Sequence, residues 1–342
     1  MSRRLSIVYL LEDTSLFGGV KIVLHQAELM ARRGHHVTVV SKGERPAWFP
    51  LEAEFRRVPA ISAAQLPAAD VTVATFWTTI AAAAAAPSGE AVHYCQGFEG
   101  GFRHNVAEHG EILEAYRRPI PALALAPHLA ALVRERFGRP ARVVPPALAP
   151  YWRPAWRRRP AEPPRVLLPN PFEIEWKGVV TGLEAVRLLR GQGRPCRLVR
   201  LSQWPLGDAE RAVIEPDEYH HHLGPREVAS LMRRTDLMLA PSWEGEGFGL
   251  PVLEAMASGL PVVASEISAF RWFAGGAATL VPADQPERFA AAAAELLGDA
   301  ARWRRSRRAG VAAARAFSEA HVAKTAEDAL RWVADGRWRS EP

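Results

Sequence analysis

The sequence predicts an α/β protein in which two Rossmann-like, doubly wound domains face a cleft. Short aliphatic or β-branched runs alternate with longer segments of helical period, which favours parallel sheets flanked by helices. This alternation occurs twice, and a proline-rich segment separates the two series. The length of 342 residues also favours two domains over one.

In the first series, strands are expected at 5–10, 36–40, 71–74, 91–95, 122–126 and 142–144. A helix over 20–33 follows the first strand and stops at Gly34, since glycine commonly lies just past a helix C-terminus. The alanine-rich run 81–86 is helical in composition.

In the second series, strands are expected at 165–168, 196–201, 236–240, 261–264 and 279–281. Helices at 178–190, 226–234, 251–258 and 287–297 separate them. The arginine-rich segment after Gly298 predicts terminal helices, one of them with Ser318 as its N-cap.

The segment 147–164 contains five prolines and no periodicity, which indicates an interdomain linker. The predicted organisation is a first domain over 1–150, a linker over 151–164, a second domain over 165–317 and a C-terminal helix over 318–342.

The composition excludes several classes of protein. Hydrophobic residues make up 48% and charged residues 23%, which is typical of a globular core and unlike a disordered chain. Two cysteines exclude a disulfide scaffold, and no apolar run has the length of a membrane span. We therefore expect a soluble, cytoplasmic chain, and contact with the inner membrane face stays open.

The net charge of +6 comes almost wholly from arginine, because only four of the 43 basic residues are lysines: Lys21, Lys42, Lys177 and Lys324. Charge alone leaves open a nucleic-acid partner, whose binding would fall steeply with salt. No nucleic-acid-reading motif accompanies the charge, so we expect no nucleic-acid partner.

The stretch 241–265, PSWEGEGFGLPVLEAMASGLPVVAS, predicts an anion site. It follows a buried strand, and Pro251 marks the first helical position. A glycine-rich loop over 247–249 thus runs into a helix N-terminus, whose free N–H groups favour a phosphate. Glu246 precedes the loop and Glu254 is expected in the first turn of the helix, where carboxylates suit sugar hydroxyls. The alternative is that both glutamates are ordinary surface acids.

These residues resemble the retaining nucleotide-sugar glycosyltransferases of family 4, whose signature is EGFGLPxxEAMAxGxPVV. The sequence has this signature from Glu246 to Val263. The resemblance implies the GT-B fold, with the first domain on the acceptor side, the second binding the donor, and the last helix crossing back. It implies that Glu246 contacts the transferred sugar, that Glu254 binds ribose hydroxyls, and that backbone N–H groups lie near the sugar and diphosphate. The residues concerned in the loop are Gly247, Phe248, Gly249 and Leu250.

Gly18 and Gly19 resemble the family's N-terminal glycine pair near the donor phosphate, although a plain strand-to-helix turn is the alternative. Lys177 resembles the family lysine that contacts the diphosphate. The family arginine five residues earlier is Phe172 here, so Arg200 or Arg226 is expected to supply that charge.

Around the fourth expected strand, the family often has a histidine near the acceptor. Gln96 is expected in its place as a neutral hydrogen-bonding group with a catalytic role, and His93 and Glu99 are candidates on the acceptor side. A core histidine is an equal alternative. Trp272 stands where the family commonly has glutamate.

The run of histidines over 220–222 could suggest a metal, but neighbours in a strand point to opposite faces. We expect no metal and no cofactor besides the nucleotide sugar, which is a substrate.

The resemblance therefore implies a retaining hexosyltransferase that uses a nucleoside diphosphate sugar, with Lys177, Glu246 and Gln96 as catalytic candidates, in the synthesis of a cell-surface polysaccharide or glycoconjugate. The acceptor can be a glycan, a lipid-linked compound or a small molecule. The alternatives are a GT-B epimerase or hydrolase, and a nonenzymatic protein that binds a nucleotide sugar or polysaccharide.

Overall fold

The computed structural model describes residues 3–155 and 159–340. The chain forms two compact units. Unit 1 comprises Met1–Ala147 together with Phe317–Pro342, and unit 2 comprises Leu148–Ala316. The expected linker, 151–164, falls at the start of unit 2, and its residues 156–158 lie outside the described residues.

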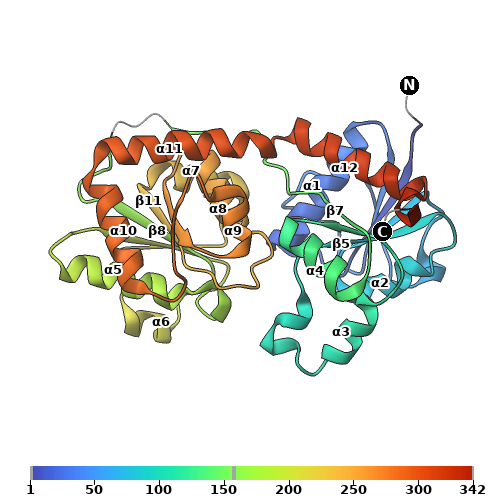
Figure 1. Ribbon diagram of the computed structural model, residues 1–342, viewed down its shortest axis with the longest axis horizontal. Coiled ribbons are helices and arrows are strands. Elements are labelled where there is room, and N and C mark those ends of the chain that lie inside the picture. The colour runs from blue at the N-terminus through green and yellow to red at the C-terminus, as the bar shows by residue number, and fades with distance from the viewer. Residues whose placement is uncertain (1–2, 156–158, 341–342) are drawn as a thin grey trace. The chain divides into compact units, whose positions relative to one another are not determined.

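Unit 1 contains a seven-stranded parallel sheet in the order β3-β2-β1-β4-β5-β6-β7. Its strands are β1 (Ser6–Leu11), β2 (His36–Ser41), β3 (Glu54–Arg57), β4 (Val71–Ala74), β5 (Glu90–Cys95), β6 (Ala122–Ala124) and β7 (Ala141–Val143). Its helices are α1 (Gly18–Arg32), α2 (Trp77–Ala84), α3 (His109–Tyr116), α4 (Pro127–Phe137) and α12 (Glu319–Ala334). Helices cover both faces of the sheet, as Figure 1 shows for α1 and α12 on one side and α2 and α3 on the other.

Unit 2 contains a six-stranded parallel sheet in the order β10-β9-β8-β11-β12-β13. Its strands are β8 (Arg165–Pro169), β9 (Arg197–Ser202), β10 (Glu218–His221), β11 (Leu237–Ala240), β12 (Val262–Ser265) and β13 (Thr279–Val281). Its helices are α5 (Val179–Gly191), α6 (Asp208–Val213), α7 (Pro225–Arg234), α8 (Leu250–Ala257), α9 (Ser268–Ala274), α10 (Pro286–Gly298) and α11 (Ala300–Ala314).

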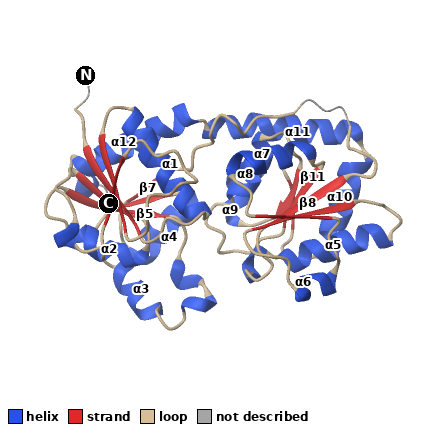
Figure 2. Cartoon of the chain, turned by 180° about the vertical axis from the view of Figure 1, so that it is seen from behind, coloured by secondary structure: helices blue, strands red, loops and turns tan. Residues whose placement is uncertain are grey.

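Both sheets contain the doubly wound order 3-2-1-4-5-6, which β7 extends in unit 1, so each has a switch point between its first and fourth strands. Figure 2 shows β8 beside β11 in unit 2. The switch point of unit 1 lies between β1 and β4, and that of unit 2 lies between β8 and β11. The predicted α/β class and the doubly wound halves are confirmed. Ligands of open α/β sheets bind at such points, outside the carboxyl ends of the strands.

Two strands were not expected from the sequence, β3 (EFRR) and β10 (EYHH). Both lie at a sheet edge, and neither contains a fully buried residue. Their charged and polar residues lack the apolar pattern by which the other strands are recognised.

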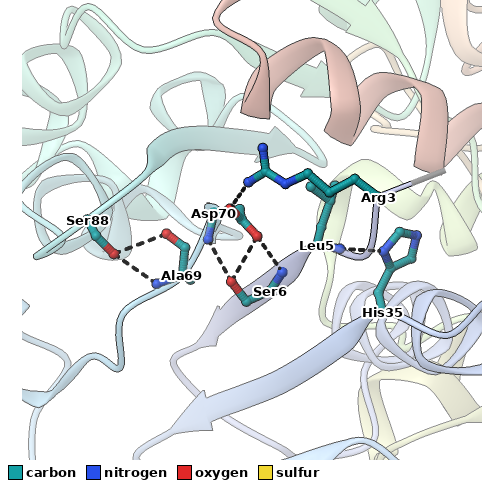
Figure 3. Close-up of polar contacts among 7 residues, drawn as sticks. All are labelled: Arg3, Leu5, Ser6, His35, Ala69, Asp70 and Ser88. Carbon is teal, nitrogen blue, oxygen red and sulfur yellow. Dashed lines mark hydrogen bonds and ion pairs between the residues drawn. The ribbon is translucent and has the colours of Figure 1, made fainter.

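An aspartate fixes the opposite, amino-terminal edge of each sheet. Asp70 precedes β4 and accepts hydrogen bonds from the Ser6 amide (2.7 Å) and the Ser6 hydroxyl (3.0 Å) at the start of β1 (Figure 3). Asp236 precedes β11 and accepts from the Arg165 amide (2.8 Å) at the start of β8. In both units, an aspartate at the amino-terminal edge accepts a hydrogen bond from a backbone amide. This edge therefore has a structural role, and the carboxyl edge is available to a ligand.

The last helix, α12, packs within unit 1 although it ends the chain. Glu319 forms a 2.8 Å bond with His25 of α1, and Glu327 pairs with Arg33 and Arg331. Ser318 is the N-cap, as expected, although its side chain makes no capping hydrogen bond.

Among the described residues, every helix is too short or too polar to cross a lipid bilayer.

Candidate active site at the switch points of the two sheets

Two loops meet at the switch point of unit 2, one after β8 and one after β11. Their backbones are joined by a 2.8 Å hydrogen bond from the Trp243 amide to the Trp176 carbonyl. Gly178 has a φ of 62°, and a Cβ there would lie 2.0 Å from the Pro241 carbonyl oxygen. Only glycine therefore allows the two loops to pack this closely.

Lys177 and Glu246 meet across these loops. The Lys177 ammonium donates to Glu246 Oε2 at 2.7 Å, and their side chains are 18% and 9% exposed. Two candidates from different parts of the sequence are thus brought together at the switch point. A lysine ammonium held at this edge of the sheet can contact a phosphate.

The glycine-rich loop leads into α8 through Gly249, the N-cap, which has a φ of 87°. A Cβ on Gly249 would lie 2.2 Å from the Phe270 ring. The Phe248 ring is buried and stacks on Phe273 at 4.7 Å, so this residue contributes its backbone to the loop surface. The amide N–H groups of Gly247, Gly249 and Leu250 have no acceptor among the described residues. They are available to an anion at the positive end of α8.

Glu254 lies in the second turn of α8, because the helix begins at Leu250 and Pro251 is its second residue. The expected first-turn position was therefore wrong, because the helix begins one residue earlier than expected. The side chain is buried, at 7% exposed. A buried carboxylate needs hydrogen-bond donors.

Arg200 does not supply the charge that Phe172 lacks. It is fully buried, pairs with Glu210 of α6, and donates to the carbonyl oxygens of Leu168 and Asn170. With its donors committed to the interior, Arg200 supports the loop after β8, and the expectation that it binds the donor is corrected.

The Phe172 side chain packs against the core formed by α5, α10 and the sheet. An apolar side chain fits this position, which explains why no cation stands there. Arg226 is exposed at the start of α7 and lies over the Tyr151 ring at 5.1 Å. It stays a candidate for the missing charge.

At the switch point of unit 1, Gln96 meets Gly19, and Gly18 is the first residue of α1. Gln96 Nε2 donates to the Thr75 carbonyl after β4 at 3.4 Å. Its Oε1 lies 3.2 Å from the position that a Cβ on Gly19 would occupy. Gly19 therefore leaves the space that the glutamine amide fills.

His93 lies in the core of unit 1, which corrects its assignment to the acceptor side, whereas Glu99 follows the carboxyl end of β5 and stays a candidate. His93 is 1% exposed, packs edge-on against Tyr116 at 5.0 Å, and burial holds its pKa well below the ordinary value. Glu99 is buried and accepts from the Tyr116 hydroxyl at 2.5 Å. Burial raises the pKa of Glu99 to about 6. His93 is thus the core histidine that the sequence left as an alternative.

Sequence reasoning missed one group at this switch point. Glu12, after β1, pairs with Lys42 after β2 and accepts from the Thr78 hydroxyl at the start of α2. Lys42 is one of four lysines and Glu12 directly follows a strand, and these two signals together would have identified the group.

The histidines over 220–222 face different partners, since His221 bonds to the Gln203 carbonyl and His220 lies near Glu218. Within residues 3–155 and 159–340, no three His, Cys, Asp or Glu side chains are grouped as metal ligands.

Residues 163–299 match the family described as Glycosyl transferases group 1. A D-inositol 3-phosphate glycosyltransferase of Nocardia farcinica is 36% identical over 136 residues, which cover 39% of this chain and 29% of the relative. Residues 163–299 are therefore similar to the group 1 glycosyltransferases. The aligned part spans less than a third of that relative's length.

Solved structures extend the likeness to both units. Sucrose-phosphate synthase from Thermosynechococcus elongatus has a TM-score of 0.77 at 17% identity, over 98% of this chain and 100% of that chain. HepE of Anabaena, in complex with UDP-glucose, has a TM-score of 0.76 at 14% identity, over 96% of this chain and 100% of that chain. These matches confirm the GT-B fold.

Proposed function

We propose that this chain transfers a hexose from a nucleoside diphosphate sugar to an acceptor hydroxyl with retention of configuration. The observation that carries the proposal is the Lys177–Glu246 pair at the switch point of unit 2, beside the glycine-rich loop of α8. The HepE structure with UDP-glucose supports a nucleotide-sugar donor.

In this proposal, the diphosphate lies between Lys177 and the N-terminus of α8. Negative charge grows on the diphosphate as the sugar–phosphate bond breaks, and a fixed ammonium with aligned N–H groups stabilises that charge. Arg226 is the remaining candidate for a second cation.

Glu246 and Glu254 divide the hydroxyls of the donor between them. Glu246 lies beside Lys177 and suits the transferred sugar, whereas Glu254 lies deeper on α8 and suits the ribose. Each carboxylate would accept hydrogen bonds from two neighbouring hydroxyls of the donor, in place of the water molecules that hydrate them in solution.

The leaving phosphate oxygen takes the proton of the acceptor hydroxyl as the new bond forms on the same face of the sugar. This step needs no protein nucleophile, so Glu246 acts by binding the sugar. Unit 1 would present the acceptor, with Gln96 as its neutral hydrogen-bonding group.

The test begins with nucleotides and ends with the product. UDP, GDP and dTDP are screened for thermal stabilisation, because a ligand that binds only the folded state raises apparent stability. The matching nucleotide sugar is then supplied with candidate acceptors, and the product anomer is read by NMR. We expect the anomeric configuration of the donor, and an inverted product would refute the mechanism.

Two rival outcomes have their own signatures in this assay. Donor consumption without acceptor would indicate a hydrolase or epimerase. Nucleotide binding with neither transfer nor hydrolysis would indicate a binding protein.

We also propose that the chain acts in the synthesis of a cell-surface polysaccharide or glycoconjugate. The proposal includes a peripheral contact with the inner membrane face. Co-sedimentation with anionic phospholipid vesicles tests the membrane contact, and we expect it to weaken with added salt.

A further inference from the structure

In each unit, the exposed aromatic side chains of the described residues lie in segments that follow strands. Phe17 follows β1, Phe76 follows β4, Trp204 follows β9, and Trp272 lies on α9 after β12. Each therefore lies beyond the carboxyl end of a strand. Exposed apolar groups that gather at a ligand-binding edge indicate a ligand with an apolar surface.

Phe17 and Phe76 flank the switch point of unit 1 and are 48% and 38% exposed. Phe17 is the N-cap of α1, and Phe76 is the N-cap of α2. Because their backbones already fulfil these capping roles, their rings are not needed for the helix starts.

Gln96 connects the two aromatic positions. Its Nε2 donates to Thr75, the neighbour of Phe76, and its amide borders Gly19, two residues after Phe17. The Thr75 carbonyl can only accept, so the amide is oriented with Oε1 towards Gly19. Gln96 Oε1 is buried and has no hydrogen-bond donor among the residues described. Such an unsatisfied acceptor is stabilised when a ligand hydroxyl reaches it.

Charged and polar groups lie on the same edge. Glu12 bonds to Lys42 and to the hydroxyl of Thr78, which lies two residues from Phe76. Lys42 and Thr78 are exposed, and the Glu12 side chain is 24% exposed. We call Phe17, Phe76, Gln96, Glu12 and Thr78 the Phe76 site.

We propose that the acceptor of this chain is a sugar of the pyranose type, bound at the Phe76 site. The C–H face of the ring stacks on Phe76, since the negative face of an aromatic ring attracts such hydrogens. The ring hydroxyls bond to Glu12, to Thr78 and to Gln96 Oε1 as the amide turns to meet them. This inference rests on the proposed function and narrows its acceptor to a class of compound.

Other acceptors fit only half of the site. An alkyl chain would cover the aromatic rings but leave Gln96 Oε1 without a donor. A linear polyol would satisfy this oxygen but leave the rings exposed. A pyranose has both kinds of surface.

The test uses saturation-transfer NMR on the full chain without donor. The probes are methyl α-D-mannopyranoside and methyl α-D-glucopyranoside, and the comparison compounds are glycerol and 1-octanol. We expect saturation of the C–H protons of at least one pyranoside, and weaker signals from both comparison compounds. Equal or stronger binding of glycerol or 1-octanol would overturn the proposal.

Variants of Phe76 then test the stacking. Phe76→Leu keeps an apolar side chain but removes the aromatic face, so the affinity for the pyranoside should fall at least tenfold. Phe76→Tyr should stay within about threefold of the wild type. Val106→Ala, at an exposed apolar position of unit 1 that is not part of the Phe76 site, is the matched control and should change nothing. Unchanged binding in Phe76→Leu would refute the stacking.

Nucleoside diphosphate binding, measured by calorimetry on the same proteins, separates the two proposals. Pyranoside binding is read without donor, so its absence contradicts the acceptor inference even where nucleotide binding supports the donor site. If the wild type binds the pyranoside but binds no nucleoside diphosphate, the proposed function is contradicted and the acceptor inference is not.

Discussion

The switch point of unit 2 carries a preformed ion pair between Lys177 and Glu246, whereas that of unit 1 carries two exposed aromatic rings and the Gln96 amide. The strand order around both points is the same. The two switch points thus share a strand order but carry different side chains. Fixed charge suits a diphosphate, and aromatic faces suit a sugar ring.

The glycines at the two switch points also differ. Gly178 and Gly249 have positive φ angles and contact neighbouring groups so closely that no Cβ fits. Gly19 has an ordinary φ, and a Cβ there would meet only the Gln96 amide. The glycines of unit 2 fix a rigid loop, and that of unit 1 leaves room beside a side chain.

The largest expected effect comes from Gly178→Ala. The left-handed φ and the clash with the Pro241 carbonyl should together lower the free energy of unfolding by about 2 to 5 kcal/mol. Gly193→Ala is the control, since Gly193 has a φ of 72° but an open surrounding, and it should lose only about 1 kcal/mol. Gly19→Ala in unit 1 should lose less than about 1 kcal/mol. Urea unfolding measures all three, and equal losses would remove the contrast between the glycines.

Lys177→Ala should lower kcat by about 10² to 10³-fold, the effect of losing one preorganised donor to developing charge. Turnover is measured as release of nucleoside diphosphate. Lys324→Ala, an exposed lysine on α12, should retain full turnover. A Lys177→Ala variant with normal kcat would show that other groups stabilise the diphosphate.

Glu254→Gln should weaken nucleotide binding by about 1 to 3 kcal/mol, because a hydrogen bond to a charged acceptor becomes one to a neutral amide. Calorimetry with the free nucleoside diphosphate measures the change. The control is Glu266→Gln, at an exposed position after β12. Unchanged affinity in Glu254→Gln would contradict the ribose assignment.

Glu99 gives the smallest expected effect and one confined to unit 1. Burial raises its pKa from 4.5 to about 6, so the folded state favours the protonated form. The resulting stability is fully present below pH 4.5 and is lost as the pH rises through about 6. Since Glu99→Gln cannot titrate, the wild type should lose up to about 2 kcal/mol relative to this variant between pH 4.5 and 7.5.

Urea unfolding at both pH values measures the Glu99 effect. Glu111→Gln, at an exposed position on α3, controls for the loss of a carboxylate. A difference between wild type and Glu99→Gln that does not change with pH would show that the pKa of Glu99 is the same in the folded and unfolded states.

The sequence was sufficient for most of the fold because its central strands are apolar and its helices have their own period. It failed at β3 and β10, whose edge positions permit charged residues. It could place Lys177 and Glu246 after separate strands, but their contact depends on β8 and β11 being neighbours, which follows only from the strand order.

Side-chain direction was the other limit of the sequence. Arg200 lies in a strand whose neighbours are apolar, and only the structure shows that α6 brings Glu210 to it. For His93 the alternation of the strand left two readings, and the packing of Tyr116 decides between them. Buried polar groups depend on partners that are distant in sequence, and local patterns do not contain them.

The central claim is that the donor diphosphate binds at the switch point of unit 2. Hydrogen–deuterium exchange with and without the stabilising nucleoside diphosphate tests it most directly. The account predicts slower exchange in residues 172–180 and 241–252, with little change in residues 11–19 and 75–80. Protection confined to the two segments of unit 1 would contradict the account.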